Sequence, residues 1–144
     1  MKTTPLSDAI LVVDDDADSR AMLVEYFLSS GFTVHAAPDG ATALELADAF
    51  RPRVILMDLA MPRLDGLETT RRLRANGRSG DATIVMVTAR AFPTDRDSAY
   101  RAGCNFFVAK PYDLAALSKL VEDLVSAPRQ TAGRLPLNFA PRSR

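Results

Sequence analysis

The sequence has a single cysteine, Cys104, a single histidine, His35, and no tryptophan among its 144 residues. One cysteine excludes an internal disulfide and suits a reducing compartment, where a lone buried thiol behaves as a small apolar side chain. With so little histidine and cysteine, the chain also lacks the cluster of ligands that a zinc site needs. We therefore expect His35, which falls within a predicted strand, to be structural.

No charge of either sign prevails, since 18 lysine and arginine residues balance 18 aspartate and glutamate residues. A net charge of zero argues against non-specific binding of nucleic acid by the chain as a whole. No apolar run approaches the roughly 20 residues of a membrane span, and the first residues lack the apolar stretch of a secretion signal. We expect a cytoplasmic protein with no membrane contact.

The length suits one domain, and apolar runs of strand length alternate with segments of helical period. This alternation is typical of repeated strand-helix units and a parallel sheet. The expected strands are 9–13, 33–36, 54–57, 83–87 and 106–109, and the expected helices are 17–30, 41–50, 65/66–76/77, 93–102 and 114–125. Because Arg71, Arg72 and Arg74 crowd the third helix, we expect much of it to face solvent.

The composition changes after Ala127, where three prolines and four arginines occur without any acidic residue. Such a segment cannot bury enough apolar surface to fold alone, so we expect residues 127–144 to form a basic, disordered tail. A basic tail can bind phosphate or an acidic partner, but a solubilising segment or a truncated linker is the simpler explanation of the composition.

Polar side chains stand where four of the expected strands end. Asp14 and Asp15 follow the first strand, Asp58 the third, Thr88 the fourth and Lys110 the last. Ligands of an open parallel sheet bind in the crevice beyond the carboxyl ends of its strands. Residues that are far apart in the sequence are therefore predicted to converge in one charged pocket.

Gathering Asp14, Asp15 and Asp58 in one crevice is electrostatically unfavourable. Two carboxylates about 4 Å apart repel by roughly 4 kcal/mol at an effective dielectric constant near 20. Mg²⁺ is the cation that best offsets this repulsion, because it is hard and prefers carboxylate, phosphate and water oxygens. Lys110 can supply the remaining positive charge, so the sequence predicts a magnesium site.

Asp58 stands alone after a buried strand and before a loop that contains Pro62. A carboxylate exposed there can attack phosphorus and form an acyl phosphate, while Thr88 and Lys110 bind the phosphoryl oxygens. Each residue also has a plainer interpretation: Asp16 as a helix cap, Thr88 as a β-branched strand residue, and Lys110 as a solvated charge. Four successive strand ends with compatible groups favour the functional interpretation.

The chain resembles the receiver domains of bacterial two-component response regulators over residues 7–126. The resemblance rests on Leu11-Val12-Val13-Asp14-Asp15, Asp58-Leu59-Ala60-Met61-Pro62-Arg63-Leu64-Asp65-Gly66, Val87-Thr88-Ala89 and Ala109-Lys110-Pro111. It implies an α/β fold of the flavodoxin-like type, with a five-stranded parallel sheet of order 2-1-3-4-5 flanked by five helices. The segment from Thr88 to Pro111, especially Ala102-Gly103-Cys104, looks most like receivers that stand alone or are fused to hybrid kinases.

The resemblance also implies a role for each site residue. Asp58 would accept a phosphoryl group from the phosphohistidine of a sensor histidine kinase or phosphotransfer protein, with Thr88 and Lys110 as its catalytic partners. The implied Mg²⁺ ligands are Asp15, Asp58 and the carbonyl of Ala60, with Asp14 acting through water. The Lys110–Pro111 peptide would be cis. The chain would be a self-phosphorylating phosphoacceptor rather than a turnover enzyme, and whether it removes its own phosphate stays open.

In this family, movement of Thr88 toward the phosphate is coupled to inward rotation of an aromatic side chain, here Phe107. Lacking a hydroxyl, Phe107 is expected to favour the buried position more than a tyrosine would. Arg90 flanks the pocket and would either screen the phosphoaspartate from water or point into solvent. Output would come from the fourth helix, last strand and fifth helix, which would bind a downstream protein partner, and no DNA-binding segment is evident.

Three other interpretations compete. A haloacid-dehalogenase-like phosphatase could use Asp14 and Asp16, but it needs a further acidic motif after Lys110. A flavodoxin-like electron carrier shares the fold class, yet three consecutive aspartates would repel the flavin phosphate. A receiver-like module that binds partners without phosphorylation does not need the acidic pocket that this sequence retains.

Overall fold

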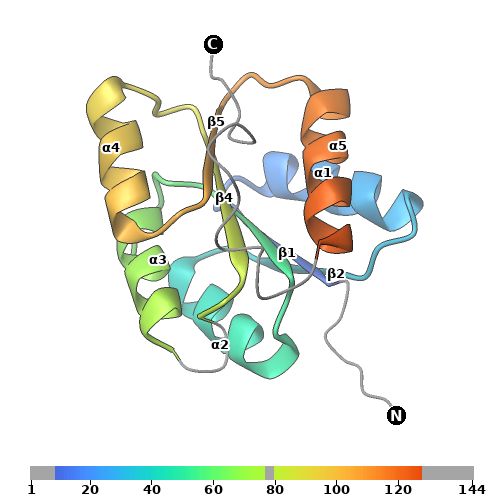
Figure 1. The fold of residues 1–144 in the computed structure, drawn as a ribbon, viewed down its shortest axis with the longest axis horizontal. Helices are drawn as coiled ribbons and strands as arrows, with labels where there is room; N and C mark the ends of the chain where they lie inside the picture. Colours follow the sequence, from blue (N-terminus) through green and yellow to red (C-terminus); the bar gives the residue numbers. More distant parts are fainter. Residues whose placement is uncertain (1–8, 77–79, 128–144) are drawn as a thin grey trace.

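Five parallel strands form one sheet in the order β2-β1-β3-β4-β5 in the computed structural model, which describes residues 9–76 and 80–127 (Figure 1). The strands are β1 (Ile10–Val13), β2 (Val34–Ala37), β3 (Val54–Met57), β4 (Thr83–Thr88) and β5 (Phe106–Ala109). The helices are α1 (Ala17–Ser29), α2 (Gly40–Phe50), α3 (Gly66–Ala75), α4 (Pro93–Ala102) and α5 (Leu114–Ser126). The predicted fold class is confirmed, and the element boundaries differ from the expected ones by at most two residues.

The sheet separates two apolar layers, because alternate side chains of each strand point to opposite faces. Leu11, Ile55 and Met86 pack on the side of α2, α3 and α4. Ile10, Leu56 and Val85 pack on the other side, against α1 and α5 (Figure 1). Burial on both faces explains why these strands are almost entirely apolar in sequence.

An aspartate caps the start of four helices, and its carboxylate accepts a hydrogen bond from a backbone N–H of the first turn. The pairs are Asp16 with Ser19, Asp39 with Thr42, Asp65 with Glu68 and Asp113 with Ala115. The plainer interpretation of Asp16 as a helix cap is thereby confirmed, with 2.8 Å between its Oδ2 and the nitrogen of Ser19.

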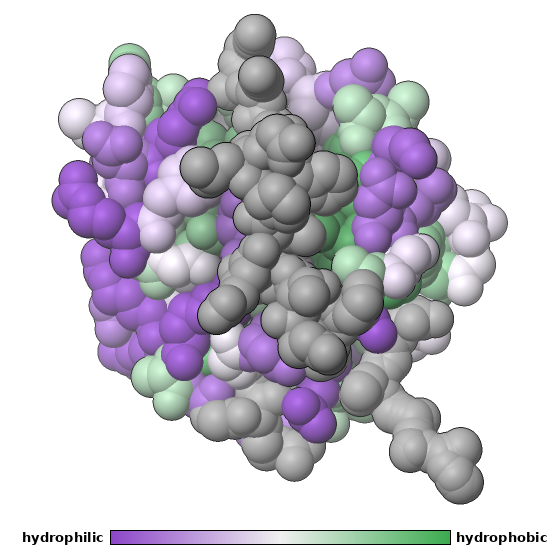
Figure 2. Space-filling model, in the orientation of Figure 1, coloured by the Kyte–Doolittle hydropathy of each residue, from purple (hydrophilic) through white to green (hydrophobic). Residues whose placement is uncertain are grey.

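The expectation that α3 faces solvent holds for only part of the helix. Arg71 and Arg72 are exposed and pair with Glu68, and hydrophilic residues gather over α3 and α4 at the left of Figure 2. Arg74 instead turns inward, where its guanidinium donates to the carbonyl of Gly103 at 2.9 Å and to Oδ1 of Asn105 at 2.7 Å. The prediction for Arg74 was wrong because these acceptors lie in the turn between α4 and β5, 29 and 31 residues further along the chain, and a helical period does not reveal such distant partners.

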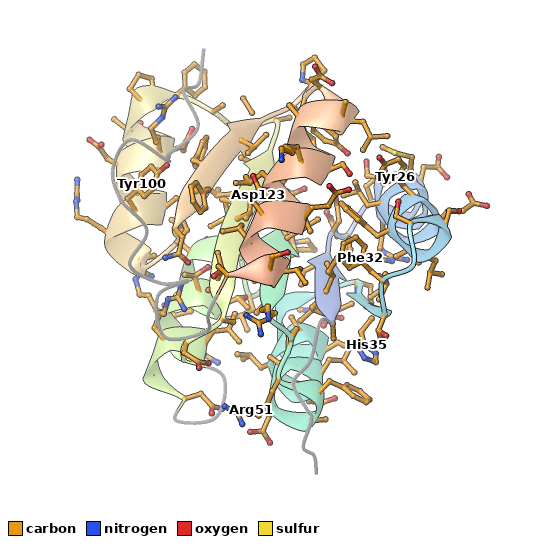
Figure 3. The ribbon with its side chains drawn as sticks, turned by 45° about the vertical axis from the view of Figure 1, so that its right-hand side comes forward. Tyr26, Phe32, His35, Arg51, Tyr100 and Asp123 are labelled. Carbon is orange, nitrogen blue, oxygen red and sulfur yellow. The ribbon has the colours of Figure 1, made fainter. Side chains whose placement is uncertain are left out.

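His35 lies on the edge strand β2, opposite Leu11, and its ring stacks on Phe50 with 3.9 Å between the ring centroids. His35 and Tyr100 of α4 lie on opposite sides of the molecule in Figure 3. Burial lowers the pKa of His35 below its usual value. This packing against the α2 helix is the structural role that the sequence predicted.

Cys104 is buried in the apolar layer on the side of α2, α3 and α4, as expected of a lone apolar thiol, and burial raises its pKa to about 12. Within the described ranges, no helix combines the length and the hydrophobicity that crossing a membrane requires. The predicted tail lies outside the described residues, apart from its first residue, Ala127.

Candidate active site

The carboxyl ends of four strands bring the predicted pocket residues to one edge of the sheet. Val13 of β1 lies beside Met57 of β3, and the N–H of Asp58 donates to the carbonyl of Val13 at 2.9 Å. At the other end of the pocket, the N–H of Lys110 donates to the carbonyl of Thr88 at 2.8 Å. Backbone hydrogen bonds of the sheet therefore set the relative positions of the residues that follow the strands.

Three carboxylates meet there, since each of Asp14, Asp15 and Asp58 offers an oxygen within 4.8 Å of the others. Asp14 is buried and is oriented by the N–H of Asp16, which donates to its Oδ1 at 2.9 Å. Asp15 is exposed, so this oxygen-rich cluster is open to solvent on one side. A set of carboxylate oxygens suits a hard divalent cation.

Lys110 bridges the two buried carboxylates of the cluster. Its Nζ lies 3.0 Å from Oδ2 of Asp14 and 3.5 Å from Oδ2 of Asp58. Burial opposes the charge on Lys110, but its hydrogen bond to Asp14 and the charges of both aspartates outweigh burial and raise its pKa. The Lys110–Pro111 peptide is cis. One lysine cannot neutralise three carboxylates, so the crevice retains negative charge.

Asp58 lies at the floor of this crevice, and its Oδ1 accepts a 3.2 Å hydrogen bond from the N–H of Ala60. Burial raises the pKa of Asp58 above its usual value, and the charge of Asp14 raises it further. A hydrogen bond from Thr88 and the charge of Lys110 lower the pKa without reversing the shift. Asp58 is therefore a buried carboxylate with cationic and hydroxyl partners, whose charge is only partly compensated.

Thr88 ends β4, and Phe107 lies on the neighbouring strand β5, opposite Met86. The hydroxyl of Thr88 contacts Asp58 and accepts a hydrogen bond from the N–H of Arg90 at 3.1 Å. Phe107 is 1% exposed, and the guanidinium of Arg96 lies 5.7 Å from the centroid of its ring. The aromatic ring thus occupies the inward position.

Gly66, the first residue of α3, allows the helix to approach the pocket backbone. A Cβ atom at this position would lie 2.3 Å from the carbonyl oxygen of Asp58 and 2.7 Å from Cα of Leu59. We expect Gly66→Ala to lower the free energy of unfolding by about 2 kcal/mol, because backbone atoms must shift to accept the methyl group. Urea denaturation measures this change.

The exposed Ala75 at the other end of α3 provides the control for Gly66→Ala. Ala75→Gly measures the difference in helix propensity between alanine and glycine, which is about 1 kcal/mol in favour of alanine. An unfolding midpoint of Gly66→Ala at or above that of the wild type would contradict the close approach.

The sequence did not predict two further contacts of the pocket. Arg20 of α1 donates from Nη1 to the carbonyl of Asp14 at 2.8 Å, across a spacing that matches no helical pair. The side chain of Arg90 is 61% exposed, and its Nε lies 3.1 Å from Oδ1 of Asp95. Asp95 stands three residues after Phe92 at the start of α4, a spacing typical of helix capping that could have indicated its role.

The fold and the site together define a doubly wound α/β domain with an acidic crevice at the carboxyl edge of its sheet. Residues 10–122 match the family model described as response regulator receiver domain. The chain belongs to this family, whose members serve two-component signal transduction. Membership leaves the phosphatase interpretation based on Asp14 and Asp16 without support.

The relatives include response regulators of mycobacteria. Response regulator MprA of Mycobacterium ulcerans is 41% identical over 112 residues, which cover 78% of this chain and 47% of MprA. Transcriptional regulatory protein PrrA of Mycobacterium bovis is 39% identical over 132 residues, which cover 92% of this chain and 56% of PrrA. The chain thus spans about half the length of these relatives.

Solved structures give the same classification. Chemotaxis protein CheY4 of Vibrio cholerae superposes with a TM-score of 0.77 and 27% identity, over 83% of this chain and 99% of CheY4. The receiver domain of the sensor histidine kinase PA1611 of Pseudomonas aeruginosa has a TM-score of 0.74 and 32% identity, over 85% of this chain and all of that domain. That structure is described with a magnesium ion coordinated in its active-site cleft.

Proposed function

We propose that Asp58 is the phosphoacceptor of this receiver domain. The observation that carries the proposal is the position of its buried carboxylate, which lies between Lys110 and Thr88 and beside the acidic pair Asp14 and Asp15. An oxygen of Asp58 forms the new bond to phosphorus while the bond from phosphorus to a histidine nitrogen of the donor breaks, and the nitrogen keeps the electron pair. A sensor histidine kinase or a phosphotransfer protein would supply that phosphohistidine.

Mg²⁺ fits the donor set of the crevice. We infer that Asp15 and Asp58 bind the ion directly, that the carbonyl of Ala60 is a third ligand and that Asp14 acts through water. When bound, the ion neutralises charge on the transferred phosphoryl group. The residual negative charge around Lys110 and the magnesium described for the PA1611 domain support this assignment.

Thr88 and Phe107 would carry the signal away from Asp58. The hydroxyl of Thr88 would move onto a phosphoryl oxygen and the buried ring of Phe107 would fill the space behind it. Phosphorylation would then shift the equilibrium between two arrangements of α4, β5 and α5, and this surface would bind a downstream protein partner. The buried position of Phe107 on β5, the strand that pairs with β4, supports this coupling.

The proposal is tested by incubating the chain with Mg²⁺ and a small acyl phosphate and measuring the intact mass. We expect a gain of one phosphoryl group, loss of the gain when a chelator removes Mg²⁺, and mapping of the modification to the peptide that contains Asp58. A gain that does not depend on Mg²⁺, or a modification mapped to the peptide with Asp14, would contradict the proposal.

A further inference from the structure

The loop between β4 and α4 is fixed at both of its ends. At the β4 end, the backbone of Thr88 is bound to β5 through the N–H of Lys110. At the α4 end, one oxygen of Asp95, Oδ2, accepts the N–H of Phe92 at 3.0 Å, and the other, Oδ1, lies 3.1 Å from Nε of Arg90. A single carboxylate thus joins the first turn of α4 to the middle of the loop.

This carboxylate is well covered although it lies at the start of a surface helix. The side chain of Asp95 is 11% exposed, whereas the side chain of Arg90 that covers it is 61% exposed. Exposed ion pairs contribute little because water competes for both partners. Here both carboxylate oxygens are engaged and shielded, so the contact restrains the loop more than an ordinary surface pair does.

The restrained loop carries the group that orients the Thr88 hydroxyl. The N–H of Arg90 donates to Oγ1 of Thr88 at 3.1 Å, so the hydroxyl proton of Thr88 stays available for an acceptor in the pocket. Asp58 is the carboxylate on which this hydroxyl acts, since Thr88 lowers the pKa of Asp58. Displacement of Arg90 would remove the donor that holds Thr88 in this orientation.

We propose that Asp95 and Arg90 form a latch that positions the Thr88 hydroxyl for phosphoryl transfer to Asp58. The inference rests on the proposed function and assigns Asp95 and Arg90 as positioning residues. Arg90 acts through its backbone and through Asp95, and its guanidinium does not contact the phosphoryl group.

The test compares Arg90→Met, Asp95→Asn and the double variant in the full chain. Asp95→Asn keeps a side-chain oxygen for the N–H of Phe92 and removes the charge that binds Arg90. We expect each single variant to take up phosphate from a small acyl phosphate about fivefold more slowly at saturating Mg²⁺, the effect of losing one well-ordered ion pair. Because both changes open the same latch, the double variant should also be about fivefold slower, not about 25-fold as for independent sites.

A second readout does not depend on phosphate. Hydrogen exchange of the Arg90 amide, which donates to Thr88, should speed up about fivefold in each single variant, while that of the Lys110 amide should stay unchanged. Glu68→Gln is the matched control, because Glu68 pairs with Arg72 at the same 3.1 Å on the surface of α3. This control should change neither readout.

Three results would overturn the latch. If Asp95→Asn took up phosphate and exchanged the Arg90 amide at the rates of the wild type, Asp95 would not position Thr88. Slow uptake in Arg90→Met together with normal uptake in Asp95→Asn would show that Arg90 acts directly on phosphate. If uptake by the double variant were about 25-fold slower, the two substitutions would act independently rather than through one contact. If the wild type gains no phosphoryl group at all, the proposed function fails, and the latch is then decided by exchange of the Arg90 amide alone.

Discussion

Asp58→Asn is expected to abolish the phosphoryl gain and, at neutral pH, to make the fold more stable. Removing the nucleophile should slow uptake from an acyl phosphate by a factor of about a thousand or more, because no other group takes over the bond to phosphorus. The amide keeps the size of the side chain and can still accept the hydrogen bond from Ala60. Intact mass measured over time reports the loss.

The gain in stability follows from the electrostatics of the crevice. Burial and the charge of Asp14 raise the pKa of Asp58, so its protonated form favours the folded state. The stability linked to this group is therefore fully present below the ordinary carboxyl pKa and is lost as the pH rises through the pKa in the folded protein. At pH 7 the wild type holds an ionised Asp58 at a cost that the asparagine variant does not have.

Urea denaturation in the presence of a chelator tests whether Asp58→Asn raises the free energy of unfolding. We expect a higher unfolding midpoint for Asp58→Asn than for the wild type at pH 7, and a smaller difference as the pH falls below about 4. Added Mg²⁺ should stabilise the wild type more than the variant, because it offsets a charge that the variant lacks. A variant that is less stable than the wild type at pH 7 would show that Lys110 and Thr88 compensate Asp58 fully.

The convergence of Asp14, Asp58, Thr88 and Lys110 could be predicted from sequence because it depends only on strand ends. Once apolar runs indicate parallel strands, the topology of the sheet places all their carboxyl ends at one edge, whatever the side chains are. The caps could also be predicted, since Asp16 acts on an N–H only three residues away. Such features depend on local spacing and on the direction of the strands.

Arg74 and Arg90 could not be placed in this way, because their partners are set by how loops fold in three dimensions. The four acceptors of Arg74 lie at Gly80, Ala82, Gly103 and Asn105, and their positions depend on how the segments that precede β4 and β5 meet α3. Arg90 lies two residues after the end of β4, so the sequence alone left open whether its side chain screens the pocket or points into solvent. Its partner, Asp95, belongs to the next helix.

Lys110→Met is expected to damage both stability and phosphoryl uptake. The substitution removes the cation between Asp14 and Asp58 and leaves two buried carboxylates without their shared partner. Breaking a largely buried ion pair from one side should lower the free energy of unfolding by about 2 kcal/mol at pH 7. Loss of a positioned cation beside the phosphoryl oxygens should slow uptake about 100-fold.

Lys119→Met is the matched control for this change. Lys119 also forms an ion pair, with 3.3 Å between its Nζ and Oδ1 of Asp123, but its side chain is 73% exposed. The same substitution there should change the free energy of unfolding by less than about 0.5 kcal/mol and leave uptake unchanged. Equal effects of the two substitutions would mean that Lys110 is only a surface charge.

The pH dependence separates the role of Lys110 from simple loss of packing. Its pKa is raised, so the stability that it contributes is present below the ordinary lysine pKa and is lost as the pH rises through the pKa in the folded protein. Without Mg²⁺, the wild type should therefore lose stability at strongly alkaline pH, and Lys110→Met should lack this step. Adding Asp58→Asn to Lys110→Met should restore part of the lost stability, because one of the two unpaired carboxylates is then removed. A double variant no more stable than Lys110→Met would show that the unpaired charge of Asp58 is not what destabilises the single variant.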